Sequence, residues 1–256
     1  MLLRRSDLVP DGIAIGFACT FVCPGIIEAI GREFDFCWVD AQHGSWELRD
    51  VAEAIRACEI VGTPAIVRVA DHTYGRIGRV LDLDPAAIIL PCVDSVEQAE
   101  AIVQAARFPP LGNRSVGARR ATDMRGAGYS RDPAAQPLVI AQIETPEGVD
   151  NVSGIVAVEG IDGLLFGPAD LTLRRGFALN TPLHGPDLAP IARAVAAAGA
   201  AVGKPMMTVA GTPEALAFAL ESGYSIVSVA VDAGLLKGAA QSALRMAHEA
   251  RGAAGK

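Results

Sequence analysis

The stretch PLVIAQIETPEGVDN, residues 137–151, contains both kinds of element from which the fold is built. Residues 137–144 are a continuous apolar run, which is typical of a strand in a parallel sheet that is covered on both faces. Thr145 then precedes Pro146 and Glu147, the pattern of an N-cap followed by proline at the first helical position. The stretch therefore predicts a buried strand that leads directly into a helix.

The same unit recurs along the chain. KPMMTVAGTPEAL, residues 204–216, repeats the order of strand, Thr-Pro-Glu and helix. We expect strands at 13–20, 34–41, 65–70, 86–93, 137–144, 163–170, 204–210 and 224–232. Eight strands alternating with helices in roughly 250 residues predict an α/β fold, a (β/α)8 TIM barrel that forms a single domain over residues 1–256. A doubly wound open sheet is the alternative, but no G-x-G-x-x-G follows the first strand.

Two further features concern the connections between these elements. We expect Ser45 to begin the helix in WELRDVAEAIRAC, and Ser95 with Gln98 to form a capping-box pattern. The longest interruption is the Gly- and Arg-rich segment 108–136, at the position expected for the loop after the fourth strand. Long loops inside compact domains are usually functional, so we expect a lid or binding segment there, with a surface insertion as the alternative.

The bulk properties exclude several classes of protein. A net charge of −7 and a pI near 5.1, with scattered arginines, argue against a nucleic-acid partner. No apolar run of about 18 residues predicts a membrane span, and no apolar segment follows the N-terminal arginines, so a cytoplasmic location is expected. No cysteine pair has C-x-x-C spacing, which favours small buried thiols over a zinc site or disulfides: Cys19, Cys23, Cys37, Cys58 and Cys92.

Polar residues gather where the predicted strands end. In a (β/α)8 barrel these carboxyl ends surround the active site. The polar residues expected there are Asp40, Gln42, His43, Arg68, Gln142, Glu144, Thr145, Asp170 and Asp232. This face is therefore the predicted site.

Glu144 and Asp170 are the candidate metal ligands. Glu144 ends an apolar strand, where a carboxylate is costly unless it is paired or binds a cation, and Asp170 ends the next strand. Two carboxylates from neighbouring strands with no soft ligand nearby predict a hard divalent cation such as Mg²⁺ or Mn²⁺. The alternatives are a salt bridge from Glu144 to an arginine and helix capping by Asp170.

Arg68 and His43 are the candidate catalytic groups. Arg68 interrupts the apolar run AIVRVA and suits a carboxylate or a developing enolate oxygen, although pairing with Glu144 or Asp40 is the alternative. His43 is the histidine expected at a strand end and is the candidate general acid/base, while His72 could also approach this face. The backbone N–H groups of Gly167 and Ala169 are candidates for binding an anionic substrate group.

The lysines separate two kinds of carbonyl chemistry. The sequence has three, and none is expected at the predicted site: Lys204, Lys237 and Lys256. A Schiff-base enzyme needs a desolvated lysine at the substrate, so carbonyl chemistry in this chain would have to use a metal ion. A GxSxG motif is also absent, which argues against an acyl-enzyme hydrolase.

The motifs FDFCWVDAQHG, AIVRV, IILPCV, AQIETPEGVDNV and LLFGPADLT occur in this order between residues 12 and 235. Together they resemble the HpcH/HpaI family of metal-dependent (class II) pyruvate aldolases. The resemblance implies a (β/α)8 barrel, a homo-hexamer built as a trimer of dimers, and a C-terminal helix, about 233–250, exchanged between subunits. It implies reversible cleavage of a 4-hydroxy-2-oxoacid into pyruvate and an aldehyde, with Mg²⁺ or Mn²⁺ as the ion and Co²⁺ as a further candidate.

The resemblance also implies a role for individual residues. Glu144 and Asp170 are similar to the metal ligands, and Gln142 and the Ala169 backbone to the pyruvate-binding positions. The catalytic roles are then an arginine that stabilises the enolate, a histidine that accepts the proton and an acidic residue that activates this histidine: Arg68, His43 and Asp82. The helix pattern puts Asp82 at the end of the third helix, so Asp40 is the alternative partner of His43. Gln42 stands where family members often carry Glu.

Two other functions remain open on the same barrel. A citrate-lyase-like or malyl-CoA-type lyase would share the carboxylate pair but would need a surface for CoA. A non-catalytic binding or regulatory barrel would hold no metal and release no pyruvate. The pocket for the aldehyde is expected to come from residues 108–136 and a neighbouring subunit.

Overall fold

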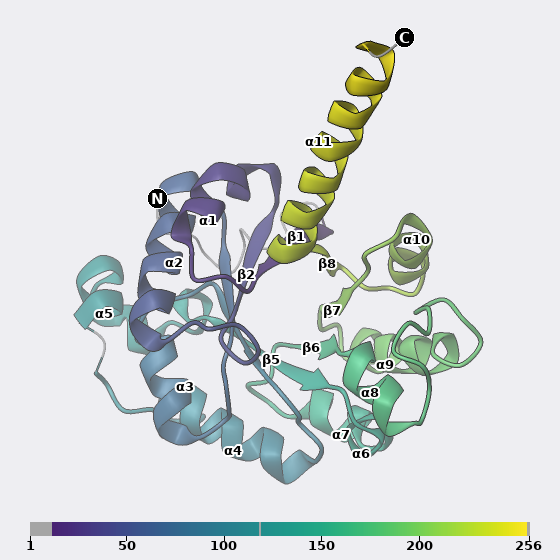
Figure 1. The fold of residues 1–256 in the computed structure, drawn as a ribbon. Coiled ribbons are helices and arrows are strands. Elements are labelled where there is room, and N and C mark those ends of the chain that lie inside the picture. Colours follow the sequence, from purple (N-terminus) through teal and green to yellow (C-terminus); the bar gives the residue numbers. More distant parts are fainter. Residues whose placement is uncertain (1–11, 118, 255–256) are drawn as a thin grey trace.

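The computed structural model describes residues 12–117 and 119–254 and is a closed parallel barrel with helices around it (Figure 1). Each strand pairs with the next one along the chain, and the eighth pairs with the first. The strands are β1 (Ala14–Cys19), β2 (Phe36–Asp40), β3 (Ala65–Arg68), β4 (Ala87–Leu90), β5 (Leu138–Ile143), β6 (Gly163–Phe166), β7 (Met206–Val209) and β8 (Ile226–Val231). The predicted single-domain TIM barrel is confirmed, and each strand lies within or overlaps its predicted run.

Helices follow the strands as the sequence pattern predicts. They are α1 (Pro24–Ile30), α2 (Leu48–Val61), α3 (Tyr74–Leu81), α4 (Val96–Ala106), α5 (Arg119–Arg125), α6 (Pro146–Asp150), α7 (Val152–Ala157), α8 (Pro168–Arg174), α9 (Ala189–Ala201), α10 (Pro213–Glu221) and α11 (Asp232–Ala254). Short 3₁₀ turns are η2 (Gly31–Glu33), η3 (Ala127–Arg131) and η4 (Pro133–Ala135).

The N-termini of the helices can be compared with the N-caps that the sequence predicts. Ser95, Thr145 and Thr212 each accept a hydrogen bond from a backbone N–H in the first turn of the following helix. The capping box predicted for Ser95 and Gln98 is not reciprocal, because the Gln98 side chain accepts from the Asp94 N–H. The expectation for Ser45 is wrong, because α2 begins at Leu48 and its cap is Glu47. Glu47 and Asp50 form a reciprocal capping box there, in which each side chain accepts from the other residue's backbone.

The core has two parts, separated by the barrel wall. Inside the barrel, side chains from alternate strand positions fill the centre: Ala14, Phe36, Trp38, Ile66, Ala87, Ile89, Leu138, Ile140, Leu165, Met207 and Ile226. A larger cluster lies between the strands and the surrounding helices. Because the strands bury both faces, they have the continuous apolar sequences from which they were predicted.

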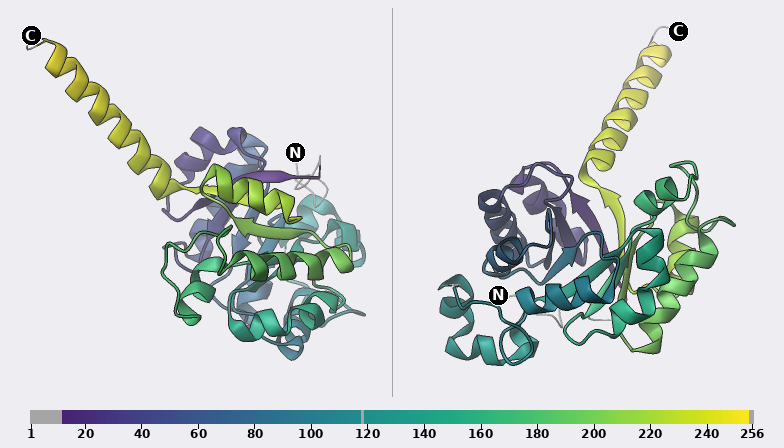
Figure 2. Two further views of the ribbon diagram at one scale, coloured as in Figure 1. Left: turned by 90° about the vertical axis from the view of Figure 1, so that its right-hand side faces the viewer. Right: turned by 90° about the horizontal axis from the view of Figure 1, so that it is seen from below.

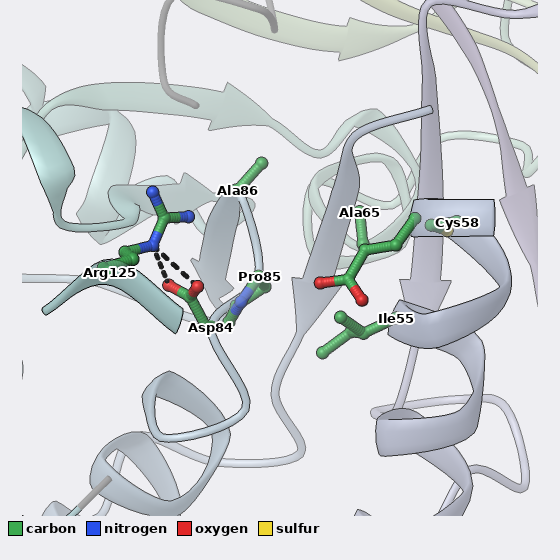
Figure 3. A pocket seen from close by; sticks show the side chains of 8 residues that line it. Ile55, Cys58, Ala65, Asp84, Pro85, Ala86 and Arg125 are labelled. Atoms are coloured by element: carbon green, nitrogen blue, oxygen red, sulfur yellow. Dashed lines mark hydrogen bonds and ion pairs between the residues drawn. The ribbon is translucent and has the colours of Figure 1, made fainter. Parts of the chain in front are cut away.

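The segment 108–136 lies at the opposite end of the barrel from the predicted site. It follows α4 and leads into β5, so its place after the fourth strand, as a lid or binding segment for the site, is wrong. Arg120 bonds the Leu83 carbonyl and pairs with Glu59, near the carboxyl ends of α3 and α2. Arg125 pairs with the buried Asp84 in the turn before β4 (Figure 3).

Figure 3 shows the small pocket beside this ion pair. Its volume is about 10 Å³, roughly the space of one water molecule. Burial raises the pKa of Asp84, although Arg125 opposes this effect. The segment therefore closes the amino-terminal end of the barrel instead of shaping a substrate pocket in this chain.

Helix α11 projects away from the barrel, with the C-terminus at its far end (Figures 1 and 2). Every described side chain from residue 233 to residue 251 is exposed in the isolated chain. These include large apolar side chains such as Leu236, Leu244 and Met246. Among the residues that the structure describes, no helix is both long and apolar enough to cross a membrane.

Candidate active site

Asp40 and Arg68 occupy paired positions at the carboxyl ends of β2 and β3. Arg68 Nε donates to Asp40 Oδ1 at 2.8 Å, and Nη2 donates to Oδ2 at 2.5 Å. Both side chains are more than nine-tenths buried. Burial alone would raise the pKa of Asp40, but the Arg68 guanidinium outweighs it and holds this pKa below its usual range. Of the partners considered for Arg68, Asp40 is the one found.

The turn after β2 brings His43 to the mouth of the barrel. Asp40 Oδ1 accepts from the backbone N–H groups of Gln42 and His43, at 3.1 and 3.3 Å. Asp40 therefore contacts His43 through the backbone, and the His43 side chain is exposed. A Cβ on Gly44 would lie 2.3 Å from the Asp40 carbonyl oxygen, so only glycine fits this turn.

A chain of hydrogen bonds leads from Arg68 across the barrel mouth. Arg68 Nη1 approaches Gln142 Oε1 at 3.4 Å, and the Gln142 amide donates to the Glu144 carboxylate. Gln142 and Glu144 thus share one face of β5, as predicted from their spacing. The other Glu144 oxygen accepts from the Cys92 backbone N–H at 2.9 Å and from its thiol at 3.1 Å.

Asp170 lies in the first turn of α8, directly after β6. Burial raises the pKa of Glu144, and the nearby charge of Asp170 raises it further, although the bonds from Cys92 oppose both. Glu144 is buried and Asp170 is half-buried. Two neighbouring carboxylates that repel each other suit a cation, and their oxygens are the donors that Mg²⁺ and Mn²⁺ prefer. The described residues hold no cluster of three or more His, Cys, Asp or Glu side chains for a metal, so two protein ligands are the set available.

Gly167 makes room for this carboxylate. A Cβ on Gly167 would lie 2.9 Å from Gln142 Nε2 and 3.1 Å from Glu144 Oε2. Its backbone N–H donates to the Ile143 carbonyl at 2.9 Å, so the expectation that this N–H binds a substrate anion is wrong. Gly167 instead contributes space. The N–H of Ala169 lies in the first turn of α8, where helical amides have no intrahelical acceptor.

Asp82 lies away from these residues within its own chain. It is the C-cap of α3 and pairs with Arg114, whose guanidinium lies close to the rings of Phe108 and Tyr129. The carboxyl ends of helices lie at the amino-terminal end of the barrel, so Asp82 and His43 occupy opposite ends. The helix pattern had indicated this position.

The described lysines, Lys204 and Lys237, lie away from the predicted site, as the sequence predicts. Lys204 Nζ donates to the carbonyls of Val156 and Val158 at the end of α7, and Lys237 is exposed on α11. Lys256 lies outside the described residues. Asp232 is the first residue of α11 and accepts bonds from the Thr20 and Phe21 backbone N–H groups, so its role is structural.

Two residues of the site were missed by sequence reasoning. Trp38 lies beneath Arg68, with the guanidinium carbon 4.8 Å from the ring centroid. It stands two residues before Asp40 and therefore on the same face of β2, a spacing that could have identified it. The sequence predicts Cys92 to be a small buried hydrophobe, yet it is half-buried and bonds Glu144.

Comparisons with known proteins agree with this geometry. A family model described as HpcH/HpaI aldolase/citrate lyase matches residues 25–239. A 4-hydroxy-2-oxovalerate aldolase from Novosphingobium aromaticivorans is 40% identical over 177 residues, 67% of each chain. A 2-dehydro-3,6-dideoxy-6-sulfogluconate aldolase from Pseudomonas putida is 34% identical over 220 residues, which cover 85% of this chain and 86% of the relative.

A solved structure has the same overall fold. The HpcH/HpaI aldolase/citrate lyase family protein from Burkholderia cenocepacia J2315 superposes with a TM-score of 0.85 at 30% identity. The match covers 95% of this chain and 98% of that one. The likeness therefore extends over the barrel and its helices.

Proposed function

This chain belongs to the HpcH/HpaI aldolase/citrate lyase family, and we propose that it is an aldolase that reversibly cleaves a 4-hydroxy-2-oxoacid into pyruvate and an aldehyde. The observation that carries the proposal is the buried carboxylate of Glu144, which lies near the half-buried Asp170 and is joined through Gln142 to Arg68. Relatives at 34–40% identity that are named as aldolases support the reaction class.

We propose that Glu144 and Asp170 hold a divalent cation, with Mg²⁺ or Mn²⁺ as the expected ion and Co²⁺ as a further candidate. When bound, such an ion supplies Lewis-acid polarisation of the 2-oxo group. The bonds from Cys92 and Gln142 fix the Glu144 carboxylate in advance, which lowers the cost of organising the site.

The substrate-binding residues follow from the same geometry. The pyruvate part of the substrate would lie against Gln142, the Ala169 N–H and Asp170, with Arg68 at its edge. Gly167 leaves space for this part because it has no side chain. Arg68 reaches the site with its direction set by Asp40, so it can stabilise an enolate oxygen without reorganising.

Cleavage requires one proton transfer at each end of the reaction. We propose that His43, directly or through a water molecule, accepts the proton of the C4 hydroxyl group. The C3–C4 bond then breaks, the aldehyde leaves, and the electron pair remains on the pyruvate enolate beside Arg68. Protonation of C3 completes pyruvate. Asp40 supports this step by holding the backbone of the His43 turn.

We propose further that α11 packs against a second copy of the chain, in a homo-hexamer built as a trimer of dimers. The exposure of Leu236, Leu244 and Met246 on a projecting helix supports this assembly, because large apolar side chains gathered on a surface mark interfaces. Asp82 could reach a His43 only in such a neighbour. Light scattering of the intact chain and of an L244E variant tests it: the variant should dissociate, and a monomeric intact chain would contradict it.

We also propose a cytoplasmic location. All five cysteines are free, including the buried Cys19, Cys37 and Cys58. Free thiols are typical of proteins in reducing compartments. Fractionation of the cells that make the protein would test the location.

The function is tested by measuring pyruvate release from a panel of 4-hydroxy-2-oxoacids, with lactate dehydrogenase as the coupling enzyme. We expect release that stops when a chelator removes the metal and returns when Mg²⁺ or Mn²⁺ is added. Activity that survives complete removal of metal would overturn the metal-dependent mechanism. Failure to release pyruvate from any member, with metal bound, would favour a lyase acting on another substrate or a binding protein.

A further inference from the structure

A cavity of about 570 Å³ opens at the barrel mouth between the ends of β1, β2, β3, β7 and β8. We call it the mouth cavity. Its lining includes Asp40 and Arg68, so it adjoins the proposed catalytic groups, whereas Glu144 and Asp170 lie beyond Arg68, at the ends of β5 and β6. The volume falls within the range of about 300–1,000 Å³ that is typical of small-molecule sites.

Trp38 bounds the mouth cavity from the barrel interior. It is 5% exposed, belongs to the interior layer of side chains, and contributes to the cavity lining. The Arg68 guanidinium lies against its ring. Trp38 therefore does two things: it ends the cavity on the interior side, and it supports the side chain that separates the cavity from the carboxylate pair.

The other walls of the mouth cavity are mainly apolar. They are formed by aliphatic side chains of β7, β8 and α11: Val209, Val229, Ala230, Val231 and Leu235. The hydroxyl groups of Thr20 and Ser228 also line it, but they donate to Asp232 and to the Ala230 carbonyl. Among the described residues that line the cavity, the charged side chains are Asp40 and Arg68, and these neutralise each other.

The position and the chemistry of the mouth cavity together indicate its ligand. Arg68 contacts Gln142 on one side and borders the mouth cavity on the other. A substrate whose 2-oxoacid part lies at Gln142 and Glu144 would extend past Arg68 into this cavity from its fourth carbon onward. We propose that the mouth cavity binds the aldehyde part of the substrate, that it accepts a short, uncharged aliphatic chain, and that Trp38 determines the length of that chain. This inference rests on the proposed aldolase function.

The charge of the walls decides between two classes of aldehyde. An aldehyde that carries a carboxylate or sulfonate would bring an anion against aliphatic walls, and the nearby cation, Arg68, already has Asp40 as its partner. An unpaired anion in such surroundings is costly. A neutral alkyl chain gains by leaving water for the same walls.

The first experiment compares aldehydes as acceptors for pyruvate with the intact, metal-loaded enzyme. The neutral aldehydes are acetaldehyde, propanal and pentanal, and the anionic ones are glyoxylate and succinic semialdehyde. We expect kcat/KM for acetaldehyde and propanal to exceed that for either anionic aldehyde by about 10-fold or more, since a mismatched group in a pocket costs about this much. An enzyme that prefers an anionic aldehyde would overturn the inference.

The second experiment changes the cavity boundary. Trp38→Leu should raise the ratio of kcat/KM for pentanal to that for acetaldehyde by about 10-fold or more, and Trp38→Phe should raise it less. Trp38→Phe removes no hydrogen bond, because the indole N–H has no acceptor among the described residues, so this variant is expected to fold. Folded variants with an unchanged ratio would show that Trp38 does not set the chain length.

Two control variants test whether the change in the pentanal-to-acetaldehyde ratio is specific to the mouth cavity. Trp46→Phe changes the other tryptophan, whose N–H donates to the Cys19 carbonyl outside the mouth cavity. Leu179→Ala enlarges a separate cavity of about 440 Å³ on the far side of Val209 and Gly211. Neither variant should change the pentanal-to-acetaldehyde ratio. A change with Leu179→Ala and none with Trp38→Leu would place the aldehyde in that second cavity and overturn the inference.

A separate measurement distinguishes failure of the proposed aldolase function from failure of the inference about the mouth cavity. Exchange of the pyruvate methyl protons in D₂O, followed by proton NMR without aldehyde, reports enolate formation alone. If exchange occurs while the aldehyde preferences differ from those above, the aldolase function stands and the inference about the mouth cavity fails. If the intact enzyme shows neither exchange nor cleavage, the proposed function itself fails.

Discussion

Arg68 and Asp40 bind each other through two parallel hydrogen bonds, Nε to Oδ1 at 2.8 Å and Nη2 to Oδ2 at 2.5 Å. This geometry holds the guanidinium plane against Trp38 and directs Nη1 toward Gln142. Asp40 is thus a positioning residue for Arg68 as well as for the turn that carries His43. The ion pair therefore connects the turn that carries His43 with the arginine that contacts Gln142.

The first prediction concerns the stability of this ion pair. Asp40→Ala leaves the Arg68 charge buried and unpaired, and we expect the free energy of unfolding in urea to fall by about 3–5 kcal/mol. Glu53→Gln is the matched control, because it removes an ion pair with Arg56 whose side chains are about half exposed. That control should cost less than about 1 kcal/mol. Equal effects of the two substitutions would contradict the structural role of Asp40.

The second prediction concerns His43. His43→Ala should lower kcat for cleavage by about 10²–10⁴-fold, the usual contribution of a general base, and should leave binding of Mn²⁺ unaffected. Turnover is measured by pyruvate release and metal binding by calorimetry. His248→Ala, on the projecting α11, is the control and should retain activity. Normal turnover of folded His43→Ala would exclude His43 as the base.

The third prediction concerns the carboxylate pair. Glu144→Gln should weaken Mn²⁺ binding more than about 100-fold, because it removes the charge of a proposed ligand. Substitution of a residue that only hydrogen-bonds to a ligand typically weakens metal binding by about 10–100-fold. Glu147→Gln, three residues later and exposed in α6, is the control and should bind Mn²⁺ normally. Calorimetry with Mn²⁺ measures both, independently of activity. Unchanged affinity in Glu144→Gln would show that the metal binds elsewhere.

The sequence could predict the barrel because each strand is buried on both faces. Runs such as the one ending in Glu144 are continuous and apolar, and the Thr-Pro-Glu starts at Thr145 and Thr212 mark where helices follow. The position of polar residues at strand ends then predicted which side chains meet, including Asp40, Arg68 and Gln142. These inferences depend only on strand order and on the two-residue repeat of a strand.

The remaining features depend on contacts between distant segments, which periodicity does not reveal. The segment 108–136 follows α4 and therefore lies at the end of the barrel opposite to the one predicted, although the capping pattern at Ser95 already indicated a helix before this segment. Cys92 contacts Glu144 because the chain turns at a positive φ of 51° after β4, and no residue type there signals that turn. The N–H of Gly167 is used by the strand pairing, which the motif alone could not show.

The fourth prediction follows from the space at Gly167. Gly167→Ala would place a Cβ within 3.1 Å of both Gln142 Nε2 and Glu144 Oε2, so the carboxylate must shift. We expect weaker Mn²⁺ binding and a kcat at least about 10-fold lower, since small displacements at a reacting centre are costly. Gly78→Ala in α3 is the control: nothing lies within 4 Å of its added Cβ. That variant should be as active as the original and more stable by about 0.5–1 kcal/mol. Gly167→Ala with normal metal affinity would show that the site tolerates the methyl group.

The last prediction concerns the dependence of stability on pH through Asp232. Its carboxylate accepts bonds from the Thr20 N–H, the Thr20 hydroxyl and the Phe21 N–H, which join α11 to the loop after β1. Burial opposes these bonds, but they prevail and lower the pKa of Asp232 below its ordinary value of 3.8. The stabilisation is therefore complete above this ordinary value and is lost as the pH falls through the lower pKa of the folded protein.

Asp232→Asn should accordingly lower the melting temperature most at neutral pH. In this variant the amide N–H₂ group faces N–H and O–H donors that the carboxylate accepted from. The unsatisfied donors should lower the free energy of unfolding by about 1–3 kcal/mol. In a chain of this size each kcal/mol corresponds to roughly 2–4 °C. The difference from the original protein should persist down to about pH 5 and shrink below about pH 4, because protonated Asp232 also loses its acceptor strength. Asp150→Asn, at an exposed carboxylate in α6, should show no such difference at any pH. Scanning calorimetry between pH 3 and 7 measures both variants, and a difference for Asp232→Asn that grew on acidification would reverse the sign argued here.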